Sequence, residues 1–295
     1  MILRLIKALI DLLIVGSSST IGNALSLACI DNKISVLSTT RRLDPSHKNT
    51  IHLDLSHPST TWQLSELEPK AAVICAGITS QRACEDHFNE TYAINVKATI
   101  ELASRLVSVG AFVVFLSSNL VFDGDLPMVS PSDSVCPKTA YGRQKAEVEQ
   151  YLLGLFPDSI SVIRFGKIMH RHYPLICDWV SNLRSNSPIS PFYDMYVAPL
   201  YIDGPLNLIQ KVLECRRPGI IHFSATYDVS YAQIAFYVAM KLGLNLELIK
   251  PVSSTFTSIG HNPRYTSLRD DNLKSLGILA CDPWIAIDQL LNELS

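Results

Sequence analysis

A tyrosine and a lysine stand four residues apart in the stretch TAYGRQKAEVEQYLLGLF. The stretch has helical spacing, and residues four apart on a helix share one face, so Tyr141 and Lys145 meet at one site. A nearby ammonium stabilises a phenolate, which predicts a lowered pKa for Tyr141 and a role as general acid or base. On its own, this spacing also occurs on ordinary surface helices.

A serine ends the apolar run AFVVFLSS, which precedes the Tyr141 segment. The run predicts a buried strand with Ser118 at its carboxyl end, and ligands of α/β sheets bind at such ends. The Ser118 hydroxyl is therefore expected to orient a substrate carbonyl beside Tyr141 and Lys145.

A glycine turn, GSSSTIG, follows the first apolar run, DLLIV. Gly16 permits a tight turn after a strand and Gly22 lets the next helix pack closely, as in pyrophosphate-binding loops. Ser19 replaces the central glycine of such loops, and its hydroxyl either donates to a phosphate or crowds it; an ordinary N-capped turn is the alternative. The residues expected to bind a cofactor here are Gly16, Ser19, Thr20, Ile21 and Gly22.

The end of the second predicted strand, VLSTTRR, bears on which cofactor binds. An acidic residue there would bond the ribose 2′-hydroxyl, whereas an arginine pairs with a 2′-phosphate. Thr40 and Arg41 stand at this point, and no carboxylate follows before Asp44. The pattern favours NADP over NAD, although two arginines on a solvated loop are common.

Short apolar runs alternate with helical patterns through the first half of the chain. This alternation predicts an α/β fold, a Rossmann-like doubly wound parallel sheet with helices on both faces. Prolines at 174, 188, 191 and 199 mark a loop-rich region that begins a smaller C-terminal substrate-binding lobe. We expect residues 1–167 and 199–222 to form the NADP-binding domain, and residues 168–198 and 223–295 to form the lobe.

The composition excludes several classes of protein. Of 295 residues, 47% are hydrophobic and 18% charged, and the net charge of −2 gives no reason to expect a nucleic-acid partner. Seven cysteines without a C-x-x-C pair indicate a reducing, cytoplasmic setting. Arg4 and Lys7 interrupt the first apolar run, so residues 1–10 are expected to be a short extension rather than a membrane span. The pair His170 and His172 lacks a third ligand, so no metal site is expected.

Five motifs in order, the glycine turn, CAG, INV, SSNLVFDG and YGRQK, resemble the extended short-chain dehydrogenase/reductase family. The segments VFDG, APLYIDGPLNLI, GIIHFSATYDVSYAQIA and NPRYTSLRDDNLKSLGI are similar to its dTDP-4-dehydrorhamnose reductase branch. The resemblance covers nearly the whole chain. It implies an NAD(P)-dependent reductase that acts on a keto group of a nucleotide-linked sugar, with a homodimer as a possible assembly.

The resemblance also implies roles by position. Ser118 stands at the family's catalytic serine or threonine, Tyr141 at its proton donor, and Lys145 at the lysine that binds the nicotinamide ribose. Asn95 matches an asparagine that supports the active-site helix. Further residues match positions beside the cofactor, namely Asp54, Leu55, Ala76 and Gly77.

Departures from the family pattern fall in the expected sugar-nucleotide pocket and leave the sugar open. They include Leu120, Gln81, Arg82 and Asn262. Candidate substrate contacts are Ser80, Asn119, Lys167 and Arg264. Two other functions stay open: an NADP-binding regulatory subunit of a partner enzyme, like the beta subunit of methionine adenosyltransferase, and a sugar-nucleotide epimerase.

Overall fold

The computed structural model describes residues 10–31, 34–42, 49–64, 66–256 and 263–294. The extension expected over residues 1–10 lies outside these ranges except for Ile10, which is buried, and Asn262 also lies outside them. The chain divides into two compact units. The first comprises Met1–Val121, Pro137–Arg164 and Leu206–Ile221, and the second comprises Phe122–Cys136, Phe165–Pro205 and His222–Ser295.

The first unit is built around a seven-stranded sheet, whose strands lie in the order β10-β6-β5-β4-β1-β2-β3. The pairs β1–β2, β2–β3, β1–β4 and β4–β5 are parallel. The strand order reverses between β1 and β4, as in a doubly wound Rossmann-like sheet, and ligands bind at the carboxyl ends of strands beside such a reversal. The strands are β1 Leu12–Val15, β2 Val36–Thr40, β3 Thr50–His52, β4 Ala71–Ile74, β5 Phe112–Ser118, β6 Ile160–Phe165 and β10 Gly219–Phe223.

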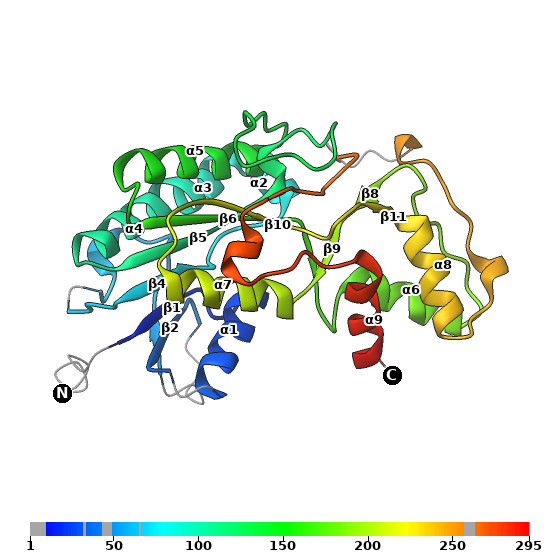
Figure 1. Ribbon diagram of the computed structural model, residues 1–295, viewed down its shortest axis with the longest axis horizontal. Coiled ribbons are helices and arrows are strands. Elements are labelled where there is room, and N and C mark those ends of the chain that lie inside the picture. Colours follow the sequence, from blue (N-terminus) through cyan, green and yellow to red (C-terminus); the bar gives the residue numbers. More distant parts are fainter. Residues whose placement is uncertain (1–9, 32–33, 43–48, 65, 257–262, 295) are drawn as a thin grey trace. The chain divides into compact units, whose positions relative to one another are not determined.

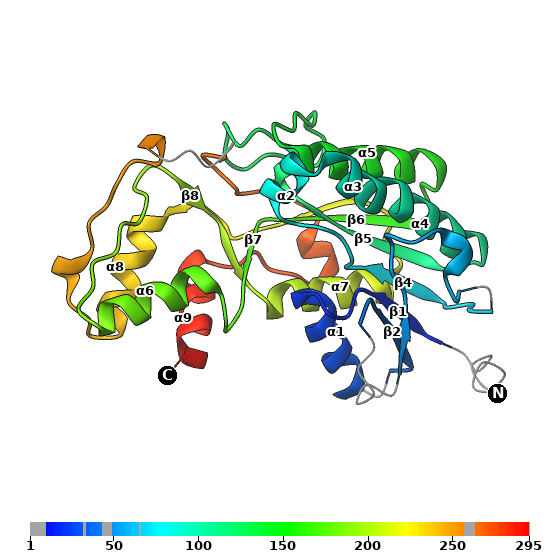
Figure 2. The same cartoon turned by 180° about the vertical axis from the view of Figure 1, so that it is seen from behind.

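The central strands form where the sequence is apolar without interruption. Every residue of β1, LLIV, and of β4, AAVI, is buried, which is expected for parallel strands covered on both faces. Helices α3, α4 and α5 lie on one face of the sheet, and α1 and most of α7 lie on the other (Figure 1, and from behind in Figure 2). The helices are α1 Thr20–Asp31, α2 Gln81–Asp86, α3 Phe88–Tyr92, α4 Thr99–Ser108, α5 Ala140–Leu155 and α7 Asp203–Cys215, with short 3₁₀ turns η2 Ser59–Thr61 and η4 Asn119–Val121.

The helical stretch from Phe88 to Ser108 is not one continuous α-helix. A π-helical segment, η3 Ala93–Ala98, separates α3 from α4 and contains the buried Asn95. Such segments are rare and occur often at functional sites.

The second unit is built of helices and small sheets. Strands β8 Tyr196–Val197 and β11 Val229–Ser230 pair antiparallel, and β7 Lys167–Met169 pairs parallel with β9 Pro199–Tyr201. Its helices are α6 Pro174–Arg184, α8 Tyr231–Lys241 and α9 Pro283–Leu294, with turns η5 Leu246–Leu248, η6 Ser254–Phe256 and η7 Leu273–Leu276. A capping box of Ser230 and Gln233 starts α8.

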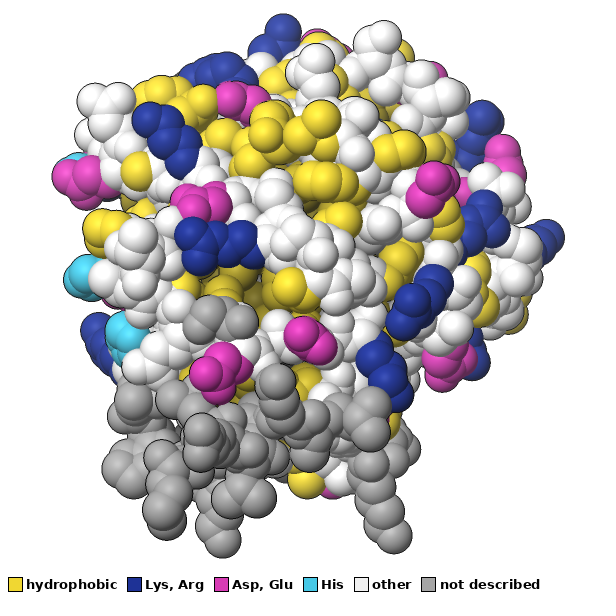
Figure 3. Space-filling view, turned by 90° about the vertical axis from the view of Figure 1, so that its left-hand side faces the viewer, with side chains coloured by type: hydrophobic (Ala, Val, Ile, Leu, Met, Phe, Trp, Pro, Cys, Tyr) yellow, Lys and Arg dark blue, Asp and Glu magenta, His cyan; other side chains and the backbone are white. Residues whose placement is uncertain are grey.

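The surface in Figure 3 carries acidic and basic side chains interspersed, with apolar side chains between them. Within the described ranges, no helix is both long enough and apolar enough to cross a membrane.

Candidate active site

Helix α5 begins against two neighbouring elements. The Thr139 hydroxyl accepts a hydrogen bond from the Gly142 N–H (3.0 Å), and the Glu85 carboxylate of α2 accepts one from the Ala140 N–H (2.6 Å). A Cβ atom on Gly142 would lie 2.0 Å from the Leu120 carbonyl oxygen, so only glycine allows this approach. The first turn of α5 therefore packs against the turn that follows Ser118.

Tyr141 and Lys145 share the buried face of α5, with exposed fractions of 7% and 8%. The Lys145 ammonium lies 5.7 Å from the Tyr141 ring centroid and 4.4 Å from that of Phe115. It donates a hydrogen bond to the Leu116 carbonyl at 2.8 Å. An ammonium has three donors, and this is the one hydrogen bond that Lys145 makes within the described part of the chain.

The environment shifts both pKa values. Burial lowers the pKa of Lys145 to about 8, against an opposing effect of the Glu149 carboxylate; at that pKa about 90% of the side chain is charged at pH 7. Burial raises the pKa of Tyr141, and Cys84 raises it further. The predicted lowering of the Tyr141 pKa is wrong for this structure, because burial desolvates the phenolate and so favours the neutral phenol. Tyr141 is consequently protonated at neutral pH, as a proton donor must be.

Ser118 ends β5, as the sequence predicts, and is half-buried. Its hydroxyl accepts a hydrogen bond from the Leu120 N–H at 3.2 Å and lies 3.4 Å from the Asn119 side-chain oxygen. Lys145 bonds the carbonyl two residues before Ser118, which ties the end of β5 to the Tyr141 helix.

A buried ion pair lies one helical turn beyond Lys145. The side chains of Glu149 and Arg164 are each 3% exposed. Arg164 Nη2 lies 2.6 Å and Nε 3.0 Å from Glu149 Oε2. The Ser117 hydroxyl donates to Glu149 Oε1. Sequence reasoning missed this trio, although Glu149 lies eight residues after Tyr141 and so on the same helical face.

Asn95 joins α5 to the loop after β4. Its Oδ1 accepts from the Ile78 N–H (2.7 Å), and its Nδ2 donates to the Ile78 carbonyl (2.9 Å) and to Gln144 Oε1 (2.8 Å). Gln144, also missed from the sequence, lies on α5 between Tyr141 and Lys145. Asn95 thus links the loop after β4 to helix α5.

Ser19 is occupied within its own turn. Its hydroxyl donates to the Gly16 carbonyl (2.9 Å) and accepts from the Gly22 N–H (3.1 Å). A Cβ atom on Gly22 would lie 2.3 Å from the Gly16 oxygen, and one on Gly16, whose φ is +88°, would lie 2.7 Å from Ala76 N. Both glycines are therefore required by close packing.

The start of α1 retains donors for an anion. Among the described residues, the N–H groups of Thr20 and Ile21 have no hydrogen-bond acceptor. Free N–H groups at the positive end of a helix bind phosphates, so this turn fits the pyrophosphate of a dinucleotide.

The remaining cofactor candidates follow neighbouring strands. Thr40 is the last residue of β2 and is buried. Arg41, the next residue, is exposed. Gly77, with φ of +152°, lies after β4 next to Asn95. Ala76 packs against Gly16.

Asp54 and the buried Leu55 follow β3, a strand that sequence reasoning missed. Burial raises the pKa of Asp54, but hydrogen bonds from the Ser56 N–H (2.9 Å) and hydroxyl (2.7 Å) outweigh it, so the pKa lies below its usual value. A carboxylate with a purely structural role, capping its own turn, would make the same hydrogen bonds.

The four candidate substrate residues divide between the units. Ser80 caps α2 by accepting from the Ala83 N–H (3.2 Å), and Asn119 starts η4; both belong to the first unit. Lys167 and Arg264 belong to the second unit and are exposed, with their cationic groups 5.5 Å and 5.4 Å from the ring centroids of Tyr173 and Tyr265.

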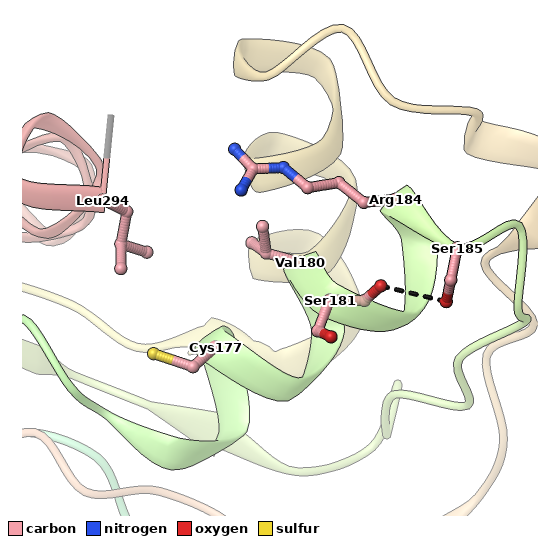
Figure 4. Close-up of a pocket in the computed structure, with 6 residues that line it drawn as sticks. All are labelled: Cys177, Val180, Ser181, Arg184, Ser185 and Leu294. Atoms are coloured by element: carbon pink, nitrogen blue, oxygen red, sulfur yellow. Dashed lines mark hydrogen bonds between the residues drawn. The ribbon is translucent and has the colours of Figure 1, made fainter.

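A pocket in the second unit contains none of these residues. It lies between α6 and the end of α9, with the Arg184 side chain on one side and Leu294 on the other (Figure 4). The Ser185 hydroxyl donates to the Ser181 carbonyl at 3.1 Å and stabilises the end of α6. Within the described ranges, no cluster of three metal-ligating side chains occurs.

The RmlD substrate binding domain family model matches residues 10–295. The chain belongs to this family. The resemblance found in the motifs is thereby confirmed, as is the Rossmann-like fold.

Relatives of known name are distant in sequence. A dTDP-4-dehydrorhamnose reductase of Aggregatibacter actinomycetemcomitans is 25% identical over 82% of this chain and 84% of its own length. The methionine adenosyltransferase 2 subunit beta of Bos taurus is 23% identical over 72% of this chain and 66% of its own length. A dTDP-4-dehydrorhamnose reductase of Bacillus anthracis, solved in complex with NADP, superposes with a TM-score of 0.84 at 21% identity, covering 96% of this chain and 98% of that one.

Proposed function

We propose that this protein is an NADPH-dependent reductase that acts on a keto group of a nucleotide-linked sugar. The observation that carries the proposal is the buried Tyr141–Lys145 pair, which α5 packs against the end of β5 at Ser118. Distant relatives named dTDP-4-dehydrorhamnose reductase support the substrate class.

The chain's own residues would stabilise the alkoxide that forms when the carbonyl is reduced. Tyr141, protonated at neutral pH, donates its proton to that oxygen, and Ser118 donates a hydrogen bond to it. Lys145 stabilises the resulting phenolate and donates to the ribose. The bound nicotinamide supplies the hydride.

The proposed cofactor site runs along the carboxyl ends of β1, β2 and β4. The free N–H groups of Thr20 and Ile21 would hold the pyrophosphate, with Gly16, Ser19 and Gly22 shaping the turn. Arg41 would bind the 2′-phosphate that distinguishes NADPH from NADH. Arg41→Ala is expected to weaken NADPH about tenfold and leave NADH unchanged.

Turnover tests the proposal directly. The wild-type protein is mixed with NADPH and a panel of dTDP-, UDP- and GDP-linked 4-keto sugars, and the loss of NADPH absorbance is followed. Oxidation that depends on one sugar nucleotide is expected. A protein that binds NADPH but oxidises it with none of these sugar nucleotides would refute the proposed reductase function.

A second candidate is a regulatory subunit, and the distant relatives named methionine adenosyltransferase 2 subunit beta favour it. In that case the chain would form a stoichiometric complex with a catalytic partner and would not oxidise NADPH. Epimerisation, in which the cofactor is recycled, is distinguished from reduction by measuring the sugar product and the NADPH together. A converted sugar without net loss of NADPH would indicate epimerisation.

The assembly and the setting of the proposed enzyme are further proposals. No disulfide bond joins the seven cysteines, all of which lie in the described ranges, and this supports the reducing cytoplasm. Light scattering tests the homodimer. Crystals with a bound sugar nucleotide test whether Ser80, Asn119, Lys167 and Arg264 contact the substrate.

A further inference from the structure

Glu149, on the Tyr141 helix, and Arg164 form an ion pair whose two side chains are buried together. Burying two charges is costly, and replacing such a pair by apolar side chains often leaves stability unchanged or higher. Stability alone therefore does not account for it, and its neighbours point to a role at the site.

Glu149 contacts the two elements that must be aligned. It lies on α5, four residues after Lys145 and eight after Tyr141, so all three side chains share one helical face. Its Oε1 accepts the Ser117 hydroxyl, and Ser117 directly precedes Ser118 in β5. One carboxylate thus links the helix of Tyr141 to the strand of Ser118.

Of the charged groups that shift the Lys145 pKa, Glu149 has the largest effect. It raises this pKa, whereas burial lowers it. The other groups facing that ammonium are the Leu116 carbonyl and Phe115 ring of β5, Cys75 after β4, and Cys84 of α2. On α5 itself, the Tyr141 ring lies beside it. Among these groups only Glu149 is a carboxylate, and burial raises the pKa of Cys75 to about 12 and also raises that of Cys84.

We propose that Glu149 is a positioning residue of the active site: held by Arg164 and Ser117, its carboxylate acts on the Lys145 ammonium one helical turn away and holds the end of β5 to the helix of Tyr141. A role of Glu149 in catalysis rests on the proposed reductase function. The effect of Glu149 on Lys145 does not, because that effect is a property of the folded chain alone.

The charge on Lys145 is measured without cofactor or substrate. Protein labelled with ¹³C at the lysine ε-carbon is titrated from pH 6 to 10.5 by NMR, and Lys145→Met assigns the signal. Glu149→Gln is expected to lower the Lys145 midpoint by about one pH unit, because the opposing carboxylate charge is lost. Arg164→Met is expected to raise it, because the carboxylate then acts without its guanidinium partner.

Glu147→Gln is the matched control, since Glu147 is an exposed carboxylate on the same helix that bonds Tyr92. The Lys145 titration midpoint of the Glu147→Gln protein should equal that of the wild type. A Glu149→Gln midpoint equal to the wild-type value would overturn the proposal. If Glu149→Gln does not fold by near-ultraviolet circular dichroism, Arg164→Met decides, and an unchanged or lowered midpoint overturns it.

Alignment is tested with Ser117→Ala, which leaves all charges in place. We expect kcat to fall about tenfold while the NADPH Kd and the Lys145 midpoint stay unchanged. A Ser117→Ala protein with full kcat would overturn the alignment role. A wild type that neither binds nor oxidises NADPH would refute the proposed function, while the NMR titration would still decide the effect of Glu149 on Lys145.

Discussion

Replacing Ser19 by alanine tests how the cofactor turn is built. The substitution removes two hydrogen bonds, from Ser19 Oγ to the Gly16 carbonyl (2.9 Å) and from the Gly22 N–H to Ser19 Oγ (3.1 Å). Loss of such a cap costs about 1 to 2 kcal/mol. We therefore expect Tm to fall by about 2 to 8 °C.

The same variant should bind NADPH with a Kd within about fivefold of the wild-type value, because the hydroxyl is occupied by the turn and the freed Gly22 N–H becomes an additional donor. Differential scanning fluorimetry measures Tm, and quenching of protein fluorescence measures Kd. Ser18→Ala, at an exposed neighbouring position, is the control and should leave Tm unchanged.

An unchanged Tm together with a Kd raised more than about 30-fold would refute this reasoning. That result would mean that the Ser19 hydroxyl contacts the phosphates rather than the turn.

Three further predictions follow from the same structure. Gly22→Ala places a Cβ atom 2.3 Å from the Gly16 oxygen, so the turn must open; urea unfolding should show a loss of about 1 to 3 kcal/mol, and NADPH binding should weaken at least tenfold. For Lys145, the folded pKa of about 8 lies below the usual 10.5, so the protonated form destabilises the fold below pH 8 and this cost is relieved as the pH rises to 10.5. Wild-type stability relative to Lys145→Met should thus rise by up to about 3 kcal/mol between pH 8 and 10.5, and a pH-independent difference would be evidence against the shift. Asn95→Ala removes the hydrogen bonds of a buried amide to Ile78 and Gln144 and should lower the free energy of unfolding by about 2 to 4 kcal/mol in chemical denaturation; an unfolding midpoint equal to that of the wild type would show that Asn95 does not hold α5.

The parts of the fold predictable from the sequence are those with local signals. Uninterrupted apolar runs marked β1, β4 and β5, because strands buried on both faces leave no polar alternation. Spacing alone placed Tyr141 and Lys145 on one helical face, and the structure brings their side chains together. Strand β3 was missed because its three residues are partly exposed and carry no apolar run.

What the sequence did not reveal depends on contacts between distant segments. The Asn95 side chain of the π-helical segment bonds Gln144 of α5, and Glu85 of α2 accepts a hydrogen bond from the Ala140 N–H at the start of α5. The predicted direction of the Tyr141 pKa shift was wrong because the nearby Lys145 is visible in the sequence, whereas the burial that raises this pKa is not.

The most direct test of the central claim is Tyr141→Phe, which removes the phenolic oxygen and keeps the ring. With NADPH and the keto-sugar nucleotide that the wild type reduces, the account predicts that kcat falls about 10²- to 10⁴-fold while the NADPH Kd changes less than about threefold. A Tyr141→Phe protein that reduces the sugar at the wild-type rate would contradict the assignment of Tyr141 as proton donor.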